Sequence, residues 1–111
     1  MKILKTLTSA AIVSAIALMA VPANAADKRI ALVVKSLGNG FFDAAAKGAE
    51  EAAAELGGIE IIYTGPTSAT AEGQIEIINA LIAQQVDAIA ISANDPDALV
   101  PVLKKAMDRG I

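Results

Sequence analysis

The polar and aromatic side chains best suited to hold a ligand follow one short apolar segment. Five consecutive apolar residues (30–34) precede Lys35, and Asn39, Phe41 and Phe42 come shortly after it. An ammonium group donates three hydrogen bonds, and a carboxamide both donates and accepts them, so these groups suit a ligand rich in hydroxyls. An aromatic ring offers a flat apolar surface to the C–H face of such a ligand. The segment is therefore a candidate site for a neutral, polyhydroxylated molecule.

Each candidate residue also has an ordinary structural interpretation. Lys35 at the end of a strand can simply be solvated. Asn39 suits a turn, because asparagine tolerates a left-handed backbone. One of the two phenylalanines is expected to pack beneath the sheet. Asn94 and Asp95 are a second pair of candidate ligands, but Asp95 before Pro96 is also typical of a helix start, with Asp as the N-cap.

Other kinds of site lack the residues that they need. The sequence contains no Cys and no His, which excludes disulfides, thiol nucleophiles, the usual zinc sites and a Ser-His-Asp triad. Gly38 and Gly40 match part of a dinucleotide-binding fingerprint, but Asp43 stands where that fingerprint requires glycine. The next predicted strand ends in Tyr63-Thr64 and not in the acid that would hold a ribose. No carboxylates are paired at predicted strand ends, so we expect neither an enzyme nor a cofactor.

The spacing of apolar residues predicts an α/β fold in which three strands alternate with three helices. Strands are expected at 30–34, 59–63 and 86–92, and helices at 42–56, 70–84 and from 96 to a cap at 110. Uninterrupted apolar strands are typical of a parallel sheet that is buried on both faces. The order β-α-β-α-β-α implies right-handed crossovers and helices on both faces, as in a doubly wound sheet, with strand order 2-1-3. Pro101 is expected to restart or bend the third helix.

One face of each predicted helix should form the core. In the first helix this face consists of small or apolar residues at 42, 45, 46, 49, 53 and 56. In the second helix it consists of Ile75, Ile78, Leu81 and Ile82, and in the third of Leu99, Val102, Leu103, Ala106 and Met107.

The first residues of the sequence have the features of an export signal. Lys2 and Lys5 precede an uncharged apolar segment (10–21), and Ala23-Asn24-Ala25 has the small-x-small pattern of a leader-peptidase site. We therefore expect residues 1–25 to be a cleavable signal peptide that directs the protein to the periplasm. The alternative, an N-terminal membrane anchor, is disfavoured because the apolar segment is short for a bilayer.

Removal of this leader would leave residues 26–111 with an acidic balance. Nine basic and 12 acidic residues become seven and 12 without Lys2 and Lys5, a net charge of −5. No basic patch remains to follow a phosphate backbone, so nucleic acid is not an expected partner. Ile111 resembles the first residue of a fourth strand. We therefore interpret residues 26–111 as the truncated N-terminal part of the first lobe of a longer protein.

The segments that follow the predicted strands resemble the periplasmic sugar-binding proteins of ABC importers, the type I periplasmic binding proteins. The resemblance is carried by residues 35–42, 63–67, 73–74, 92–97 and 103–106. Within this group the chain is most similar to the rhamnose-binding branch, and next to the branch that binds the signal autoinducer-2. The resemblance extends over residues 28–111, whereas a whole family member is much longer and has two lobes.

This resemblance implies a bilobal, monomeric protein that closes on one sugar and delivers it to a membrane permease. The position of Lys35 hydrogen-bonds the ligand in autoinducer-2 relatives, and those of Asn39, Phe41 and Phe42 contact or stack on sugar in ribose relatives. Ribose relatives have a small hydroxyl residue in place of Lys35 and Pro in place of Gly40, which argues against plain ribose specificity. The resemblance favours rhamnose as the ligand, with an autoinducer-2-type signal as the alternative.

A repressor core and a small exported enzyme are the alternatives to a role in sugar import. The ligand-sensing core of a transcriptional repressor shares the fold, but a repressor would carry a DNA-binding head where this chain has an export signal. A small exported α/β enzyme would need catalytic groups that the sequence does not bring together. Sugar binding without chemical conversion remains the prediction.

Overall fold

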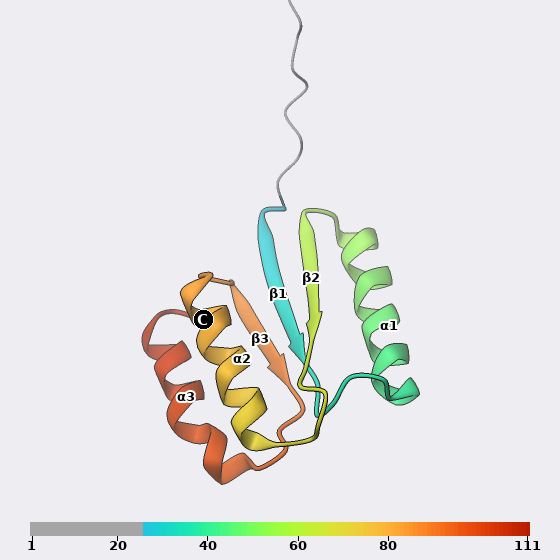
Figure 1. Ribbon diagram of the computed structural model, residues 1–111. Helices are drawn as coiled ribbons and strands as arrows, with labels where there is room; N and C mark the ends of the chain where they lie inside the picture. Colours follow the sequence, from blue (N-terminus) through green and yellow to red (C-terminus); the bar gives the residue numbers. More distant parts are fainter. Residues whose placement is uncertain (1–25) are drawn as a thin grey trace, which may run out of the picture.

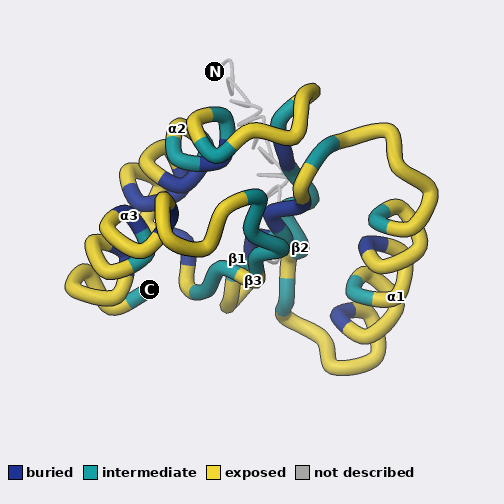
Figure 2. Tube along the Cα trace, turned by 90° about the horizontal axis from the view of Figure 1, so that it is seen from below, coloured by how far each residue is buried: buried dark blue, intermediate teal, exposed yellow. Residues whose placement is uncertain are grey.

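The computed structural model describes residues 26–111, which form a parallel sheet between helices (Figure 1). The strands are β1 (Lys28–Val33), β2 (Ile59–Thr64) and β3 (Ala88–Ile91), in the order β2-β1-β3. The helices are α1 (Gly40–Leu56), α2 (Ala71–Ala83) and α3 (Pro96–Asp108). Helix α1 lies on one side of the sheet beside β2, whereas α2 and α3 lie together on the other side (Figure 2). The predicted α/β class, the alternation of elements and the strand order are confirmed.

One sequence prediction cannot be compared with the structure. The expected signal peptide, residues 1–25, lies outside the described residues. Within residues 26–111, no helix has both the length and the apolar character needed to cross a membrane.

Strand β1 is the central strand, paired with β2 on one edge and with β3 on the other. Ala31 and Val33 have no exposed surface, and Val34, directly after the strand, is 1% exposed. Ala31 pairs with Ile62 of β2 on one side and with Ile89 of β3 on the other. A strand with neighbours on both edges and helices over both faces needs apolar residues at every position, which explains the uninterrupted apolar segment.

The larger part of the core lies between α2, α3 and β3. Its buried members are Ile78, Ile82, Leu99, Val102 and Ala106, and Ile89 and Ile91 of β3 pack against them. Three residues that were predicted to belong to the core do not, and one of them, Ala45, is exposed on α1. Met107 is 72% exposed because it lies at the free edge of β3, and Leu56 is 75% exposed at the last residue of α1.

Other details of the predicted elements also differ from the structure. Strand β1 spans Lys28–Val33, whereas residues 30–34 were predicted. Strand β3 is shorter than predicted because Val86 still belongs to the turn after α2, where its N–H donates to the carbonyl of Leu81. Helix α3 runs through Pro101 without a restart. The N–H of Ile111 donates to the carbonyl of Ala106 at 3.1 Å, and a fourth strand beginning there stays a prediction.

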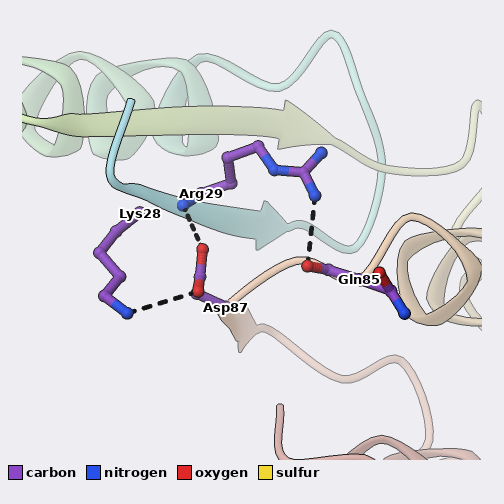
Figure 3. Close-up of polar contacts among 4 residues, drawn as sticks. All are labelled: Lys28, Arg29, Gln85 and Asp87. Atoms are coloured by element: carbon purple, nitrogen blue, oxygen red, sulfur yellow. Dashed lines mark hydrogen bonds and ion pairs between the residues drawn. The ribbon is translucent and has the colours of Figure 1, made fainter. Parts of the chain in front are cut away.

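At the amino-terminal edge of the sheet, Arg29 and Asp87 join β1 to the end of α2 and the start of β3 (Figure 3). The Arg29 guanidinium donates to the carbonyl oxygens of Gln84 and Gln85. Gln85 has a φ of 56°, so this guanidinium holds a left-handed turn in place. The Arg29 backbone N–H donates to Asp87 Oδ2 at 2.7 Å, and Lys28 Nζ lies 3.5 Å from Asp87 Oδ1.

This cluster predicts how acid affects stability. The hydrogen bond from the Arg29 backbone, assisted by the charges of Lys28 and Arg29, holds the pKa of Asp87 below its ordinary value of 3.8. Because the folded state has the lower pKa, the contribution of the carboxylate to stability is complete above that ordinary value and is lost as pH falls through the folded pKa. Asp87→Asn should therefore lower the free energy of unfolding at pH 7 and flatten its dependence on pH below about pH 4. Urea unfolding at several pH values measures both effects. The same acid dependence in the variant and the wild type would contradict this assignment.

Candidate ligand-binding site

The loops that follow the three strands all emerge at the carboxyl-terminal edge of the sheet (Figure 1). In open α/β sheets, ligands bind in the crevice outside these strand ends. The loop after β1 carries Lys35 and ends at Asn39, the N-cap of α1. The loop after β3 carries Asn94 and Asp95. The structure therefore brings the predicted site residues to one edge of the sheet, although they belong to two loops and one helix start.

Asn39 fixes the start of α1. Its Oδ1 accepts a hydrogen bond from the Phe41 N–H at 3.0 Å, and its carbonyl oxygen accepts from the N–H groups of Phe42 and Asp43. This cap is the reason that the helix begins at Gly40, two residues before the predicted start. The prediction that Asn39 serves a turn through a left-handed backbone is wrong, because its φ is −104° and the residue is extended. Its structural role is that of an N-cap. Among residues 26–111, no hydrogen-bond acceptor faces its Nδ2 donors, which leaves them able to bind a ligand.

The two phenylalanines at the start of α1 have different environments. Phe41 is 75% exposed, whereas Phe42 is half-buried. Their ring centroids are 5.3 Å apart and the ring planes meet at 84°, an edge-to-face arrangement. Phe42 thus supports Phe41, and the Phe41 ring presents its surface to solvent at the edge where a ligand is expected.

The backbone around Lys35 is held from both sides while its side chain remains exposed. On one side, the N–H of Val34 donates to the carbonyl of Thr64 at 2.9 Å. On the other side, the carbonyl of Lys35 accepts a hydrogen bond from Asn94 Nδ2 at 2.9 Å. The Lys35 side chain therefore extends from a backbone that hydrogen bonds hold in place.

Asn94 and Asp95 use their side chains on the backbone of this chain. Asn94 Nδ2 donates to the carbonyls of Lys35 and Thr70, at 2.9 and 3.2 Å. Asp95 Oδ1 accepts from two N–H groups in the first turn of α3, at 2.9 and 3.0 Å. Asp95 is therefore the N-cap of α3, and Asn94 joins three loops. These contacts favour the structural interpretation of both residues.

A hydrogen bond that the sequence analysis missed joins β2 to α1. The hydroxyl of Tyr63, near the end of β2, donates to Asp43 Oδ1 at 2.9 Å. Desolvation raises the pKa of Tyr63, and the hydrogen bond and charge of Asp43 raise it further. The phenol therefore stays protonated and remains a donor. This contact holds the first turn of α1, with both phenylalanines, against β2.

A buried glutamine was also missed as a site residue. Gln74 has no exposed surface. Its Nε2 donates to the carbonyls of Val34 and Ser92, at 3.0 and 2.9 Å, and its Oε1 accepts from the Asn94 N–H at 2.8 Å. The spacing of the sequence could have indicated its burial, because Gln74 lies four residues before Ile78 and therefore on the same, buried face of α2.

Two glycines let the loops at this edge approach one another closely. A Cβ on Gly65 would lie 2.8 Å from Cγ2 of Val34, and a Cβ on Gly73 would lie 2.7 Å from Cβ of Pro66. Both separations are shorter than van der Waals contact allows, so glycine is needed where the loop after β2 meets β1 and α2.

A pair of glycine substitutions tests this packing. Gly73→Ala should lower the free energy of unfolding by about 1–2 kcal/mol, because overpacking against Pro66 outweighs the gain in helix propensity. Gly48→Ala, in the interior of α1 with no atom near the added Cβ, should raise it by about 0.5–1 kcal/mol. Urea unfolding compares the two. Stabilisation by both substitutions would show that α2 does not approach Pro66 as closely as the structure has it.

Two hollows lie elsewhere on the described part of the chain. One, of about 300 Å³, is lined by residues at the ends of α2 and α3, including Gln85, Asp87 and Arg109. The other, of about 320 Å³, is mainly apolar and follows the free edge of β3 beside Met107. Neither includes a predicted site residue. Within residues 26–111, no group of three or more His, Cys, Asp or Glu side chains is placed to hold a metal ion.

Comparison with known proteins gives one family and several named relatives. The model of a family described as periplasmic binding protein domain matches residues 30–111. The D-ribose/D-allose-binding protein of Pseudomonas aeruginosa is 43% identical over 97 residues, which cover 85% of this chain and 30% of that protein. The chain thus spans less than a third of the length of this curated relative.

Solved structures show the same fold. An ABC transporter solute-binding protein from Clostridium phytofermentas with bound L-rhamnose has a TM-score of 0.70 and 44% identity, over 76% of this chain and 26% of that one. LsrB from Clostridium saccharobutylicum in complex with AI-2 has a TM-score of 0.72 and 32% identity, over 75% of this chain and 25% of that one. These matches, too, cover about a quarter of the longer chains.

Proposed function

Because the chain belongs to the periplasmic binding protein domain family, we propose that it takes part in sugar uptake. In this proposal it is the N-terminal part of a longer, bilobal protein that captures a sugar in the periplasm. That protein then delivers the sugar, chemically unchanged, to the permease of an ABC importer. The observation that carries the proposal is the grouping of a cation, an amide and an exposed ring at the carboxyl edge of the sheet. The relatives favour this class over a repressor core, since the rhamnose-bound relative is an ABC transporter solute-binding protein and the curated relative is a sugar-binding protein.

Each of four residues has a proposed role in the site. Lys35 donates hydrogen bonds to sugar hydroxyls from its fixed backbone. Asn39 donates through Nδ2 while its oxygen caps α1. Phe41 stacks on the apolar face of the sugar, and Phe42 holds that ring through its edge-to-face contact. Asn94 and Asp95 remain candidates, but their backbone contacts make positioning of the loops the better supported role.

These residues supply only one wall of a binding site. A small ligand in a protein pocket buries about 70–90% of its surface, which side chains on one open edge cannot provide. The missing contacts are assigned to the second lobe, which closes over the sugar by a hinge motion. Tight binding should therefore require the longer protein.

Rhamnose is the sugar that we propose as the ligand. The rhamnose-bound relative and the D-ribose/D-allose-binding relative are similarly identical to this chain, at 44% and 43%. The choice of rhamnose therefore rests on Lys35 and Gly40, which depart from the ribose type. An AI-2-type signal is the second candidate, because the AI-2-bound relative has the same fold at 32% identity.

Calorimetric titration of the longer protein with L-rhamnose, D-ribose, D-allose and AI-2 tests both levels of the proposal. We expect L-rhamnose to bind at least about tenfold more tightly than D-ribose. Tightest binding of another member of this panel would overturn the rhamnose assignment and leave the uptake role standing. The absence of binding to the whole panel would overturn the uptake role as well.

A further inference from the structure

We propose that Gln74 is a positioning residue for the sugar site, which it serves by locking the ends of β1 and β3 to each other. The proposal rests on the function proposed above. Gln74 is fully buried, so it cannot touch the sugar. Its effect on binding must pass through the backbone that carries Lys35.

The place of Gln74 in the sheet supports this role. In the strand order β2-β1-β3, helix α1 follows β1 on one side of the sheet and α3 follows β3 on the other (Figure 2). The crevice between the ends of two such strands is where ligands bind in open α/β sheets. The last bond of the ladder runs from the Ser92 N–H to the carbonyl of Val33 at 2.9 Å. Beyond it, the carbonyls of Val34 and Ser92 both accept from Gln74 Nε2. Gln74 therefore bridges the two strands at the base of the crevice.

A second route links Gln74 to Lys35 through Asn94. Gln74 Oε1 accepts from the Asn94 N–H at 2.8 Å, and Asn94 Nδ2 donates to the carbonyls of Lys35 and Thr70. Two hydrogen bonds thus fix the backbone at Lys35. Gln74 holds the carbonyl of Val34, and Asn94 holds the carbonyl of Lys35 itself. The two carboxamides together hold the loops after β1 and β3 and the start of α2.

The residue type argues against a purely structural role in the core. The other buried residues of α2 are Ile78, Leu81 and Ile82, and an apolar residue at position 74 would continue that face. A buried carboxamide is unfavourable unless its hydrogen bonds are satisfied. All three bonds of Gln74 go to loop backbone at the carboxyl edge. A polar residue at this position therefore serves the geometry of the loops.

The first experiment compares Gln74→Met with Ile78→Ala in the longer protein. Methionine keeps the length of the side chain and removes its three hydrogen bonds. Ile78 is equally buried one turn away and makes only apolar contacts, so its truncation is a matched control for lost stability. Calorimetry should show sugar affinity about tenfold or more weaker for Gln74→Met and within about twofold of wild type for Ile78→Ala. Unchanged affinity in Gln74→Met, or affinity that falls in both variants with their loss of stability, would overturn the proposal.

A second measurement needs no sugar. Backbone hydrogen exchange should be about tenfold faster or more at the Asn94 N–H in Gln74→Met than in Ile78→Ala, after correction for global stability. Equal exchange in the two variants would overturn the positioning role. If the wild-type protein binds no sugar, the proposed uptake role fails by itself, and the exchange data still decide whether Gln74 fixes the loops.

Discussion

Replacing Lys35 with methionine in the longer protein is expected to weaken sugar binding by about ten- to a hundredfold. The lost interaction is a charged hydrogen bond in a desolvated cleft, worth about 1.5–3 kcal/mol. Methionine keeps the unbranched side chain but removes all three donors. Lys35 is exposed, and within residues 26–111 only its backbone is hydrogen-bonded, so the free energy of unfolding should hardly change. Isothermal titration calorimetry measures the dissociation constant directly.

Lys47→Met is the matched control for this substitution. Lys47 is exposed on α1, where its Nζ lies 3.9 Å from Glu51 Oε1, and it has no part in the proposed site. Its replacement should leave the dissociation constant within about twofold of wild type. If Lys35→Met binds sugar as well as this control does, Lys35 is only a solvated strand end.

Phe41→Ala is expected to weaken sugar binding by about tenfold. Loss of the ring removes the apolar surface against which the sugar would be buried, at a cost of about 1–2 kcal/mol. The Phe41 ring is 75% exposed and contacts the Phe42 ring edge to face. Its loss should therefore lower the free energy of unfolding by less than about 1 kcal/mol. Calorimetry and urea unfolding of the same samples separate the two effects.

Leu56→Ala provides a control with the same exposure. Leu56 is also 75% exposed, but it lies at the opposite end of α1 from Phe41. Its truncation removes a similar apolar surface without reaching the proposed site, so sugar affinity should not change. Equal losses of affinity in the two variants would show that Phe41 does not contact the sugar.

The fold was predictable because its main signals are local. The uninterrupted apolar residues 30–34 predicted a central strand, and the buried pairing of Ala31 with both neighbours confirms it. The errors occur at residues whose burial depends on tertiary contacts. Met107 has the helical spacing of a core residue, but no element covers it at the free edge of β3 within residues 26–111.

The site was predictable only in part. Lys35 and Phe41 were predicted as site residues because they follow a buried strand, and ligands bind beyond strand ends. The structure places both at the carboxyl-terminal edge of the sheet, and their contact with a ligand stays a prediction. The hydrogen bonds that fix them join residues far apart in the sequence, such as Gln74 with Val34 and Tyr63 with Asp43. Helical periodicity shows that Gln74 lies on the buried face of α2, but its partners become visible only when the loops are assembled.

The most direct test is a crystal structure of the longer protein with its sugar bound. The central claim is that the end of β1 and the start of α1 form one wall of the occupied cleft. We expect a sugar hydroxyl within hydrogen-bonding distance of Lys35 Nζ and the ring of Phe41 packed against the sugar. A sugar bound with both side chains still in solvent and remote from it would contradict the claim.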